Sequence, residues 1–169
     1  KQVWGFRYGF AGLASPSQLP PLPLNADTIR NIQELPGTIL GTSRGPQSEV
    51  EMVDTLQGYS INMLFAIGGE GTLQGASRLV AEINRRNLKI AVVSIPKTID
   101  NDLSWIERSF GFATAVEAAR EVLNAAHAEA ASAFNGIGLV KLMGRHSGFI
   151  AAHATLATAN VNFCLVPEI

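Results

Sequence analysis

The fold class is decided by the run Asn62-Met63-Leu64-Phe65-Ala66-Ile67-Gly68-Gly69-Glu70-Gly71-Thr72. Its first part is a continuous apolar stretch, which is typical of a strand buried on both faces of a parallel sheet. The glycines that follow predict a tight turn, and the residues from about 72 to 86 predict a helix. The run is therefore expected to form one strand–turn–helix unit.

The same alternation continues towards the C-terminus. Further strands are predicted at residues 90–95, 137–143 and 163–166, and helices at residues 112–131 and 149–157. Alternating strands and helices indicate an α/β fold whose parallel sheet is covered by helices on both faces. The predicted helix at residues 112–131 has one apolar face, which consists of Val116, Ala119, Leu123, Ala126 and Ala130.

Residues 1–61 are less regular. A strand is predicted at residues 2–6, an irregular proline-rich surface segment at 11–24 and a short helix near 27–35. Ser48 and Glu51 form a capping-box pattern, which predicts a helix that reaches about residue 57. The whole chain, residues 1–169, is interpreted as one partial domain, an internal fragment, because a strand pattern lies almost at each end.

Composition excludes several classes of protein. Of the 169 residues, 47% are apolar and 16% are charged, which fits a globular interior and excludes a disordered tail. The formal net charge of -1 predicts no nucleic-acid partner and no anionic membrane surface. No apolar run approaches the roughly 20 residues of a membrane helix. The single cysteine, Cys164, excludes an internal disulfide and favours a reducing, cytoplasmic location.

The first candidate loop is Gly68-Gly69-Glu70-Gly71-Thr72-Leu73-Gln74-Gly75. Glycines between a strand and a helix let the backbone approach a phosphate, and the helix N-terminus supplies free N–H groups and the positive end of a dipole. Glu70 is a carboxylate at the same turn, where it is a candidate ligand for Mg²⁺. The alternative is an ordinary turn with a solvated glutamate.

The second candidate loop is Pro96-Lys97-Thr98-Ile99-Asp100-Asn101-Asp102. Asp100 or Asp102 is a candidate to accept a proton from an attacking hydroxyl or to hold a metal, and Lys97 and Thr98 are candidates to orient phosphate oxygens. In an extended loop, residues 98, 100 and 102 would share one face. The alternative is a turn that satisfies its polar groups with its own backbone.

The third candidate loop is Met143-Gly144-Arg145-His146-Ser147-Gly148. Arg145, between a predicted strand and a predicted helix, is a candidate phosphate ligand because guanidinium binds phosphate through two parallel hydrogen bonds. A surface ion pair is the alternative. Arg44 is a further, less specific phosphate candidate. Structural roles are expected for His127 and His153, and Trp4 and Trp105 are expected to pack.

These three loops, in this order and spacing, resemble those of the 6-phosphofructokinase family, and the similarity extends along essentially the whole chain. Residues 68–72 resemble its nucleotide and magnesium loop, residues 96–102 its catalytic loop, and residues 143–145 its sugar-phosphate strand end. The run at 140–151 is similar to the plant, protist and bacterial branch. Glu70 departs from the aspartate expected there.

The resemblance implies glycolytic transfer of a phosphoryl group from MgATP to fructose 6-phosphate, with a catalytic role for Asp100, Thr98 and Arg145. Asp100 would take the proton of the C1 hydroxyl. The sugar phosphate would contact Thr98, Ile99, Asp100, Met143, Gly144 and Arg145. The nucleotide would contact Arg44, Gly45, Gly69, Gly71, Thr72, Gly75 and Lys97. Mg²⁺ would be held by Glu70 and Asp102, and the full-length form would be a homo-oligomer.

The choice of phosphoryl donor depends on two positions. Pyrophosphate-dependent relatives carry aspartate where this chain has Gly71, and they carry lysine at Lys97. ATP-dependent members of the similar branch combine glycine with lysine, as here, so ATP is favoured over pyrophosphate. Two further hypotheses are a truncated or degenerate homologue that binds a ligand or a partner subunit without catalysis, and a lipid or NAD kinase. The latter lacks the second and third loops at this spacing.

Overall fold

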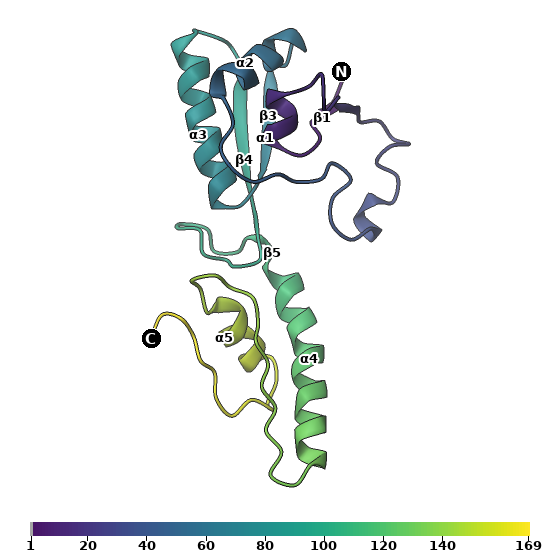
Figure 1. Cartoon of the computed structure of the whole chain (residues 1–169), viewed down its shortest axis with the longest axis vertical. Coiled ribbons are helices and arrows are strands. Elements are labelled where there is room, and N and C mark those ends of the chain that lie inside the picture. Colours follow the sequence, from purple (N-terminus) through teal and green to yellow (C-terminus); the bar gives the residue numbers. More distant parts are fainter. Residues whose placement is uncertain (1) are drawn as a thin grey trace. The chain divides into compact units, whose positions relative to one another are not determined.

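The computed structural model describes residues 2–169 and contains two compact units. The first unit comprises the residues up to Ala66 together with Gln74–Val93. The second comprises Ile67–Leu73 and Ser94–Ile169. Figure 1 labels the helices and strands, which are described below for each unit separately.

The first unit packs three helices against one face of a sheet. Its helices and strands are β1 (Trp4–Gly5), α1 (Phe10–Ala14), β2 (Leu22–Pro23), the 3-10 helix η1 (Ile32–Glu34), α2 (Glu49–Gly58), most of β3 (Met63–Gly68) and α3 (Glu70–Arg85), and the start of β4 (Ala91–Thr98). The core consists of Leu13, Met52, Val53, Leu56, Leu79 and Ile83. Leu64 of β3 and Val92 of β4 pack against this core, so α1, α2 and α3 cover the side of the sheet to which these two residues belong.

Helix α2 begins as the sequence predicts. Ser48 is its N-cap, and the Ser48 hydroxyl accepts a hydrogen bond from the Glu51 amide at 3.3 Å. An N-cap of this kind satisfies one of the amides that a helix leaves free at its start. The buried residues Met52, Val53 and Leu56 then lie on one face of α2, towards the core.

The second unit contains the end of β3, the first turn of α3, the end of β4, β5 (Phe110–Gly111), α4 (Phe112–Ser132) and α5 (Phe149–Leu156). Helices α4 and α5 pack against each other. The predicted apolar face of α4 is confirmed, because Ala119 is buried and the other four predicted positions are half-buried, while most of their neighbours are exposed.

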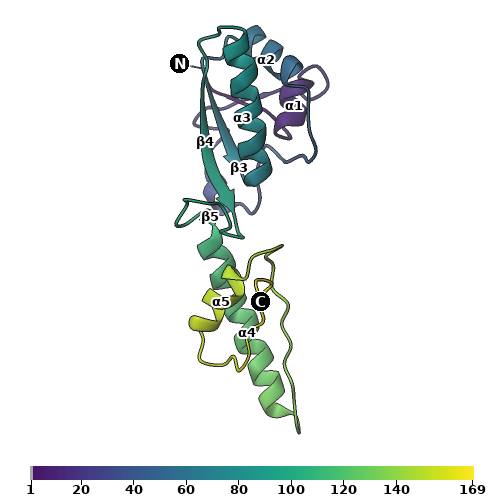
Figure 2. The ribbon, with the colours of Figure 1, turned by 90° about the vertical axis from the view of Figure 1, so that its left-hand side faces the viewer.

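The sheet has the order β3-β4-β5, and β4 and β5 pair in parallel, with Lys97 opposite Phe110 and Thr98 opposite Gly111. In Figure 2, β3 and β4 point the same way. The predicted α/β class with a parallel sheet is therefore confirmed. The side chains of Met63, Phe65 and Ile67 on the other face of β3 are more than half exposed, so in this structure helices cover one face of that strand rather than both.

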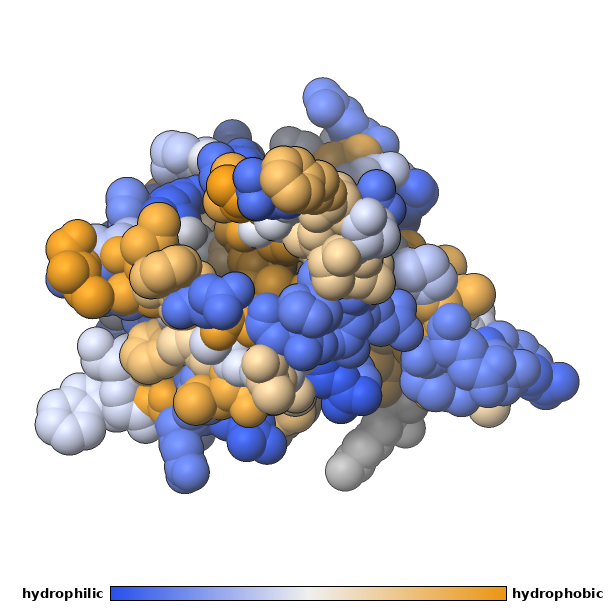
Figure 3. All heavy atoms as spheres, turned by 90° about the horizontal axis from the view of Figure 1, so that it is seen from below, coloured by the Kyte–Doolittle hydropathy of each residue, from blue (hydrophilic) through white to orange (hydrophobic). Residues whose placement is uncertain are grey.

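The predicted strands at residues 137–143 and 163–166 are wrong for this structure. Both segments are irregular, and the described residues provide no neighbouring strand with which they pair. Their apolar side chains are accordingly open to solvent, with Ile137 92% and Phe163 87% exposed. Figure 3 shows apolar residues reaching the surface on the face seen from below. An apolar run forms a strand only where a partner can satisfy its backbone groups.

The prediction for the N-terminal residues is also only partly correct. The segment at 11–24 is not wholly irregular, because it includes most of α1 and all of β2, which pairs antiparallel with β1. The helix expected near 27–35 is reduced to turns and η1. Trp4 packs as expected, with its ring 5.7 Å from that of Tyr59, whereas Trp105 is fully exposed. No described helix is both long and apolar enough to cross a membrane.

Helices α2 and α3 are joined by a set of ion pairs around Arg86, which directly follows α3. Its guanidinium bonds to Asp54 of α2 at 2.5 Å and to Glu82 of α3 at 2.6 Å. Arg85 also bonds to Glu82, through two contacts of 2.7 Å. Hydrogen bonds from Arg85 and Arg86 lower the pKa of Glu82 to about 2.

Replacing Glu82 is expected to change how stability depends on pH. The folded state holds the pKa of Glu82 below its ordinary value of 4.5. The resulting stabilisation is complete above about pH 4.5 and is lost as the pH falls towards about 2. Glu82→Gln should therefore lower the free energy of unfolding at pH 7, by an amount that shrinks between pH 4.5 and 3 in urea titrations.

Glu121 is the matched control for this experiment, because it is an exposed helical glutamate for which the described residues show no ion pair. Glu121→Gln should leave the stability unchanged at every pH. A difference between Glu82→Gln and the parent that stays constant from pH 7 to pH 3 would contradict the assignment.

Candidate functional site

The second and third candidate loops and residues 68–73 of the first belong to the second unit, where the structure brings them together. A Cβ placed on Gly69, in the first loop, would lie 3.7 Å from Cβ of Thr98 and 3.8 Å from the carbonyl oxygen of Lys97 in the second. The hydroxyl of Ser147, in the third loop, donates a 2.8 Å hydrogen bond to the carbonyl oxygen of Asp100. Polar groups from three separate parts of the sequence therefore lie around the end of β4.

The first loop is shorter than predicted, because α3 begins at Glu70 rather than near Thr72. The carbonyl oxygen of Gly69 accepts hydrogen bonds from the amides of Thr72 at 3.0 Å and Leu73 at 3.1 Å. Gly71 and Thr72 thus lie in the first turn of a long helix, where the positive end of the helix dipole favours an anion. A Cβ placed on Gly71 would meet no other atom within 4 Å, so packing does not require glycine there.

Gly75, by contrast, is required by packing. It belongs to the first unit, and a Cβ at this position would lie 2.5 Å from an atom of the Phe10 ring. Arg44 and Gly45 also belong to the first unit and are exposed. Within the described part of the chain, no hydrogen bond or ion pair engages the Arg44 guanidinium, which leaves this cation available to a ligand.

The second loop begins later than predicted, because β4 continues to Thr98 and pairs with β5 from Lys97 onwards. The Asp100 amide donates a 3.2 Å hydrogen bond to the Thr98 hydroxyl. Asn101 has a φ of 56°, so the chain turns sharply there and the loop is not extended, which is the condition for residues 98, 100 and 102 to share one face. Thr98, Ile99 and Asp100 are half-buried, whereas Lys97 and Asp102 are exposed.

A network of hydrogen bonds that the sequence analysis missed holds this turn. The Ser109 hydroxyl donates to the Thr98 carbonyl oxygen at 2.7 Å, and the Ser109 amide donates to Oδ1 of Asn101 at 2.7 Å. Nδ2 of Asn101 donates to the carbonyl oxygen of Glu107 at 3.1 Å. The Asx-rich turn, which is the alternative for this loop, is therefore present, but the Asp100 carboxylate takes no part in these side-chain contacts.

The third loop presents Arg145 from a turn that requires glycine. Gly144 has a φ of 125°, and a Cβ there would collide with the carbonyl oxygen of Ser147, so both the backbone angle and the close approach require glycine. Arg145 is exposed, and no described residue pairs with its guanidinium. The surface ion pair, which is the alternative role for Arg145, is therefore absent among residues 2–169. Met143, one position before Gly144, is 73% exposed.

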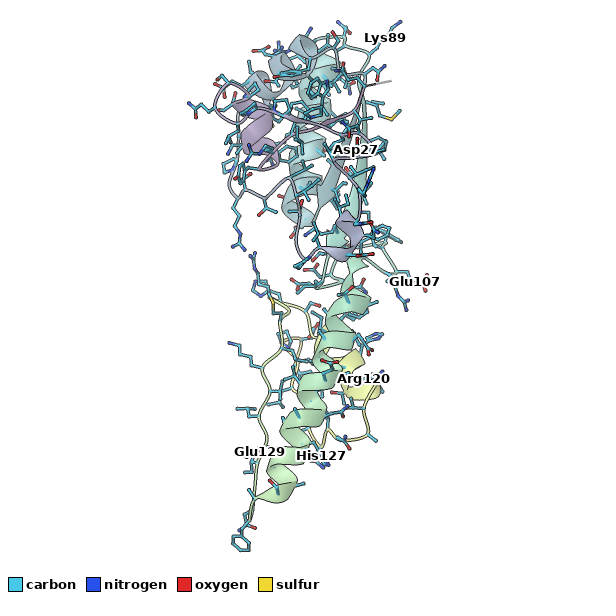
Figure 4. The ribbon with its side chains drawn as sticks, turned by 90° about the vertical axis from the view of Figure 1, so that its right-hand side faces the viewer. Asp27, Lys89, Glu107, Arg120, His127 and Glu129 are labelled. Carbon is cyan, nitrogen blue, oxygen red and sulfur yellow. The ribbon has the colours of Figure 1, made fainter. Side chains whose placement is uncertain are left out.

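The second and third loops also border a hollow of about 350 Å³ in the second unit. Its ionisable lining side chains are Asp102, Glu107, His146 and Glu168. Figure 4 labels Glu107 on the connection between β4 and β5. Glu168 also caps α5, because its carboxylate accepts a 2.7 Å hydrogen bond from the Gly148 amide.

The residues predicted to hold Mg²⁺ fit this ion by chemistry. No cluster of three or more acidic, histidine or cysteine side chains suited to a metal occurs in the described chain. Mg²⁺ does not require such a cluster, because it commonly uses one or two carboxylates together with phosphate oxygens and water. Glu70 and Asp102 are exposed carboxylates on two of the three loops, which is the type and number of ligands expected.

The two helical histidines lie outside the three loops. The His153 ring packs edge-on against Phe112 at 5.0 Å, which confirms the structural role predicted for it. His127 lies on α4, where Figure 4 labels it between Arg120 and Glu129.

Comparison with known proteins gives a consistent family. A family model described as phosphofructokinase matches residues 1–169. The chain is 54% identical over its whole length to an ATP-dependent 6-phosphofructokinase of Borreliella burgdorferi, and 51% identical over 99% of its length to ATP-dependent 6-phosphofructokinase 7 of Arabidopsis thaliana. It covers 38% and 34% of these two relatives, so it spans little more than a third of their length.

A solved structure supports the same similarity. The crystal structure of a pyrophosphate-dependent phosphofructokinase from Marinobacter aquaeolei matches with a TM-score of 0.78 at 25% sequence identity. The match covers 99% of this chain and 45% of that one. The fold is therefore shared by enzymes named for different phosphoryl donors.

Proposed function

This chain belongs to the phosphofructokinase family, and on that premise we propose that the protein containing it transfers the γ-phosphoryl group of MgATP to the C1 hydroxyl of fructose 6-phosphate. The products are fructose 1,6-bisphosphate and ADP. The observation that carries the proposal is the convergence of the three loops at the end of β4, through the Ser147–Asp100 hydrogen bond and the proximity of Gly69 to Thr98. That convergence puts an acceptor for a proton, a helix N-terminus and an unpaired arginine in one unit.

Asp100 is the proposed general base. Its carboxylate takes the proton from the C1 hydroxyl while the C1 oxygen bonds to the γ-phosphorus. The bond from that phosphorus to the β,γ-bridging oxygen breaks, and ADP leaves. Thr98 contacts the phosphoryl group in transfer, and Ile99 contacts the sugar. Met143, Gly144 and Arg145 bind the sugar phosphate, and Arg145 also neutralises phosphate charge.

The remaining residues are assigned to the nucleotide and its metal. The nucleotide phosphates bind at the N-terminus of α3, next to Gly69, Gly71 and Thr72, and Lys97 supplies a positive charge. Arg44, Gly45 and Gly75 belong to the first unit, and we assign them to the nucleotide from the family resemblance alone. Mg²⁺, held by Glu70 and Asp102, would neutralise charge on the phosphate oxygens.

We favour ATP over pyrophosphate as the donor because of Gly71. The open space around this position accommodates a nucleotide phosphate, whereas an aspartate there would place a negative charge against it. Initial rates with MgATP and with magnesium pyrophosphate, measured on the full-length protein, test the choice. Faster turnover with pyrophosphate would overturn it.

A degenerate homologue that binds ligand without catalysis is the second candidate. Glu70 favours it, because it places the carboxylate one methylene further from the backbone than the expected aspartate, and displacement of a catalytic group by about 1 Å can cost about a hundredfold in rate. A coupled assay of fructose 1,6-bisphosphate formation separates the two. MgATP binding without turnover in the full-length protein would support the degenerate homologue.

Replacing Arg145 is expected to weaken use of the sugar phosphate. Loss of a charge-assisted hydrogen bond costs about 1.5–3 kcal/mol, so Arg145→Ala should lower kcat/KM for fructose 6-phosphate about 10- to 100-fold. Arg120→Ala is the control, since Arg120 is exposed on α4 and, among the described residues, pairs only with Glu117. If kcat/KM is unchanged in the Arg145→Ala enzyme, Arg145 does not bind the sugar phosphate.

Two broader properties are further proposals. We propose that residues 1–169 are part of one phosphofructokinase domain whose full-length form is a cytoplasmic homo-oligomer. The single cysteine supports a reducing compartment. Light scattering of the full-length protein would test the oligomeric state.

A further inference from the structure

The backbone of the second loop is held from both sides by buried serines. The Ser109 hydroxyl donates to the Thr98 carbonyl oxygen at 2.7 Å, and the Ser147 hydroxyl donates to the Asp100 carbonyl oxygen at 2.8 Å. The two serines are 3% and 5% exposed. They come from different parts of the chain, so the pair clamps the segment 98–100 between two independent supports.

Each serine is itself fixed in place. The Ser109 amide donates to Oδ1 of Asn101 at 2.7 Å, and Asn101 holds the turn that ends the segment. The Ser147 backbone carbonyl lies directly against Gly144, whose left-handed angle fixes the turn that carries Arg145. Ser147 therefore contacts the Arg145 turn through its backbone and the Asp100 backbone through its side chain.

Neither serine reaches the carboxylate of Asp100 or the guanidinium of Arg145 in any contact of the described residues. Their hydroxyls bond only to backbone carbonyl oxygens and, for Ser109, to the Asn101 side chain at 3.1 Å. Hydroxyls that bind only the backbone can affect the reaction rate only indirectly, by fixing the orientation of a neighbouring side chain. A solvated turn would not need two buried hydroxyls on carbonyl groups only two residues apart.

We propose that Ser109 and Ser147 are positioning residues that aim the Asp100 carboxylate, and that Ser147 also fixes the spacing between Asp100 and the Arg145 turn. This inference rests on the proposed function, because it assigns Asp100 as the base. It extends that function by giving two residues with no ligand contact a part in the rate of the chemical step.

Kinetics of the full-length protein give the first test. Ser147→Ala and Ser109→Ala should each lower kcat about 10- to 100-fold, because a misplacement near 1 Å costs up to about a hundredfold, and should change KM for fructose 6-phosphate by less than about threefold. Ser147→Thr keeps the hydroxyl and should recover most of kcat. Ser104→Ala is the control, since Ser104 is exposed in the same connection and makes no hydrogen bond within the described chain.

A double-mutant cycle separates positioning from general destabilisation. In an Asp100→Asn background there is no base to aim, so adding Ser147→Ala should lower the residual rate by less than about twofold. If Ser147→Ala costs the same factor in both backgrounds, or if kcat falls only in step with the melting temperature, the serines are structural and the proposal is overturned.

Hydrogen exchange gives a readout that does not depend on turnover. Amides of residues 98–102 should exchange faster in Ser109→Ala and Ser147→Ala than in the parent or in Ser104→Ala. If the amides of residues 98–102 exchange at the same rate in the serine variants as in the parent, the two serines do not hold this segment and the proposal is overturned. A parent protein that makes no fructose 1,6-bisphosphate would contradict the proposed function instead, and the exchange data would still decide whether the serines hold the loop.

Discussion

Asp100→Asn is expected to lower kcat by about 10²–10⁴-fold in the full-length protein, while KM for fructose 6-phosphate changes little. Proton transfer by a positioned base contributes a factor of this size, and asparagine keeps the shape of the side chain while losing the ability to accept the proton. Asp100 is half-buried, and its backbone is fixed by bonds to Thr98 and Ser147, so the substitution should leave the loop in place. Initial rates at saturating MgATP measure the effect.

Asp27 provides the matched control for this substitution. It is exposed in the first unit, where it pairs with Arg30 at 2.7 Å, and Figure 4 labels it. Asp27→Asn should retain full turnover. An Asp100→Asn protein within about threefold of the parent kcat would remove Asp100 from the role of base.

Gly71→Asp should have opposite effects on activity and on stability. A carboxylate in the first turn of α3 interacts favourably with the helix dipole, by about 0.3–1 kcal/mol, and the Cβ meets no other atom within 4 Å. The melting temperature should therefore be unchanged or slightly higher. The same carboxylate would repel the nucleotide phosphates by several kcal/mol, which corresponds to about a 100-fold or greater loss of kcat/KM for MgATP.

Gly71→Ala separates charge from bulk at this position, because it adds a Cβ without a charge. Alanine should cost less than about tenfold in kcat/KM for MgATP. Equal losses for alanine and aspartate would show that the space itself matters, and no loss for aspartate would contradict the placement of nucleotide phosphates near Gly71. Thermal unfolding of both variants checks that the fold is intact.

Three features could be predicted from the sequence alone: the strand–turn–helix unit from Met63 to Arg85, the N-cap at Ser48 and the apolar face of α4. In these cases a local signal, such as a capping residue or a helical period, is also the physical cause of the structure. The α/β class follows in the same way from the alternation of apolar runs with helical patterns.

The predicted strands at 137–143 and 163–166 show where that reasoning fails. An apolar run is equally compatible with a strand and with an extended segment, and the choice depends on a neighbour that the run itself does not specify. The same holds for Thr98, which is part of β4 because β5 lies beside it. Pairing between distant segments is not encoded in either one alone.

The candidate site divides along similar lines. The ionisable residues of the three loops, Asp100 and Arg145 among them, could be chosen from residue type and position after a strand. Ser109 and Ser147 could not, because their importance comes from hydrogen bonds to carbonyl groups 11 and 47 residues away in the chain. Gly71 and Gly75 look alike in the sequence, yet one faces open space and the other the Phe10 ring.

The central claim is that the protein transfers a phosphoryl group to fructose 6-phosphate, and phosphorus NMR of one reaction mixture tests it directly. With fructose 6-phosphate and MgATP, the account predicts that fructose 1,6-bisphosphate and ADP appear in equal amounts, with no free phosphate, and that Asp100→Asn makes both far more slowly. ADP and inorganic phosphate without the bisphosphate, or no change in the ATP signals with the full-length protein, would contradict it.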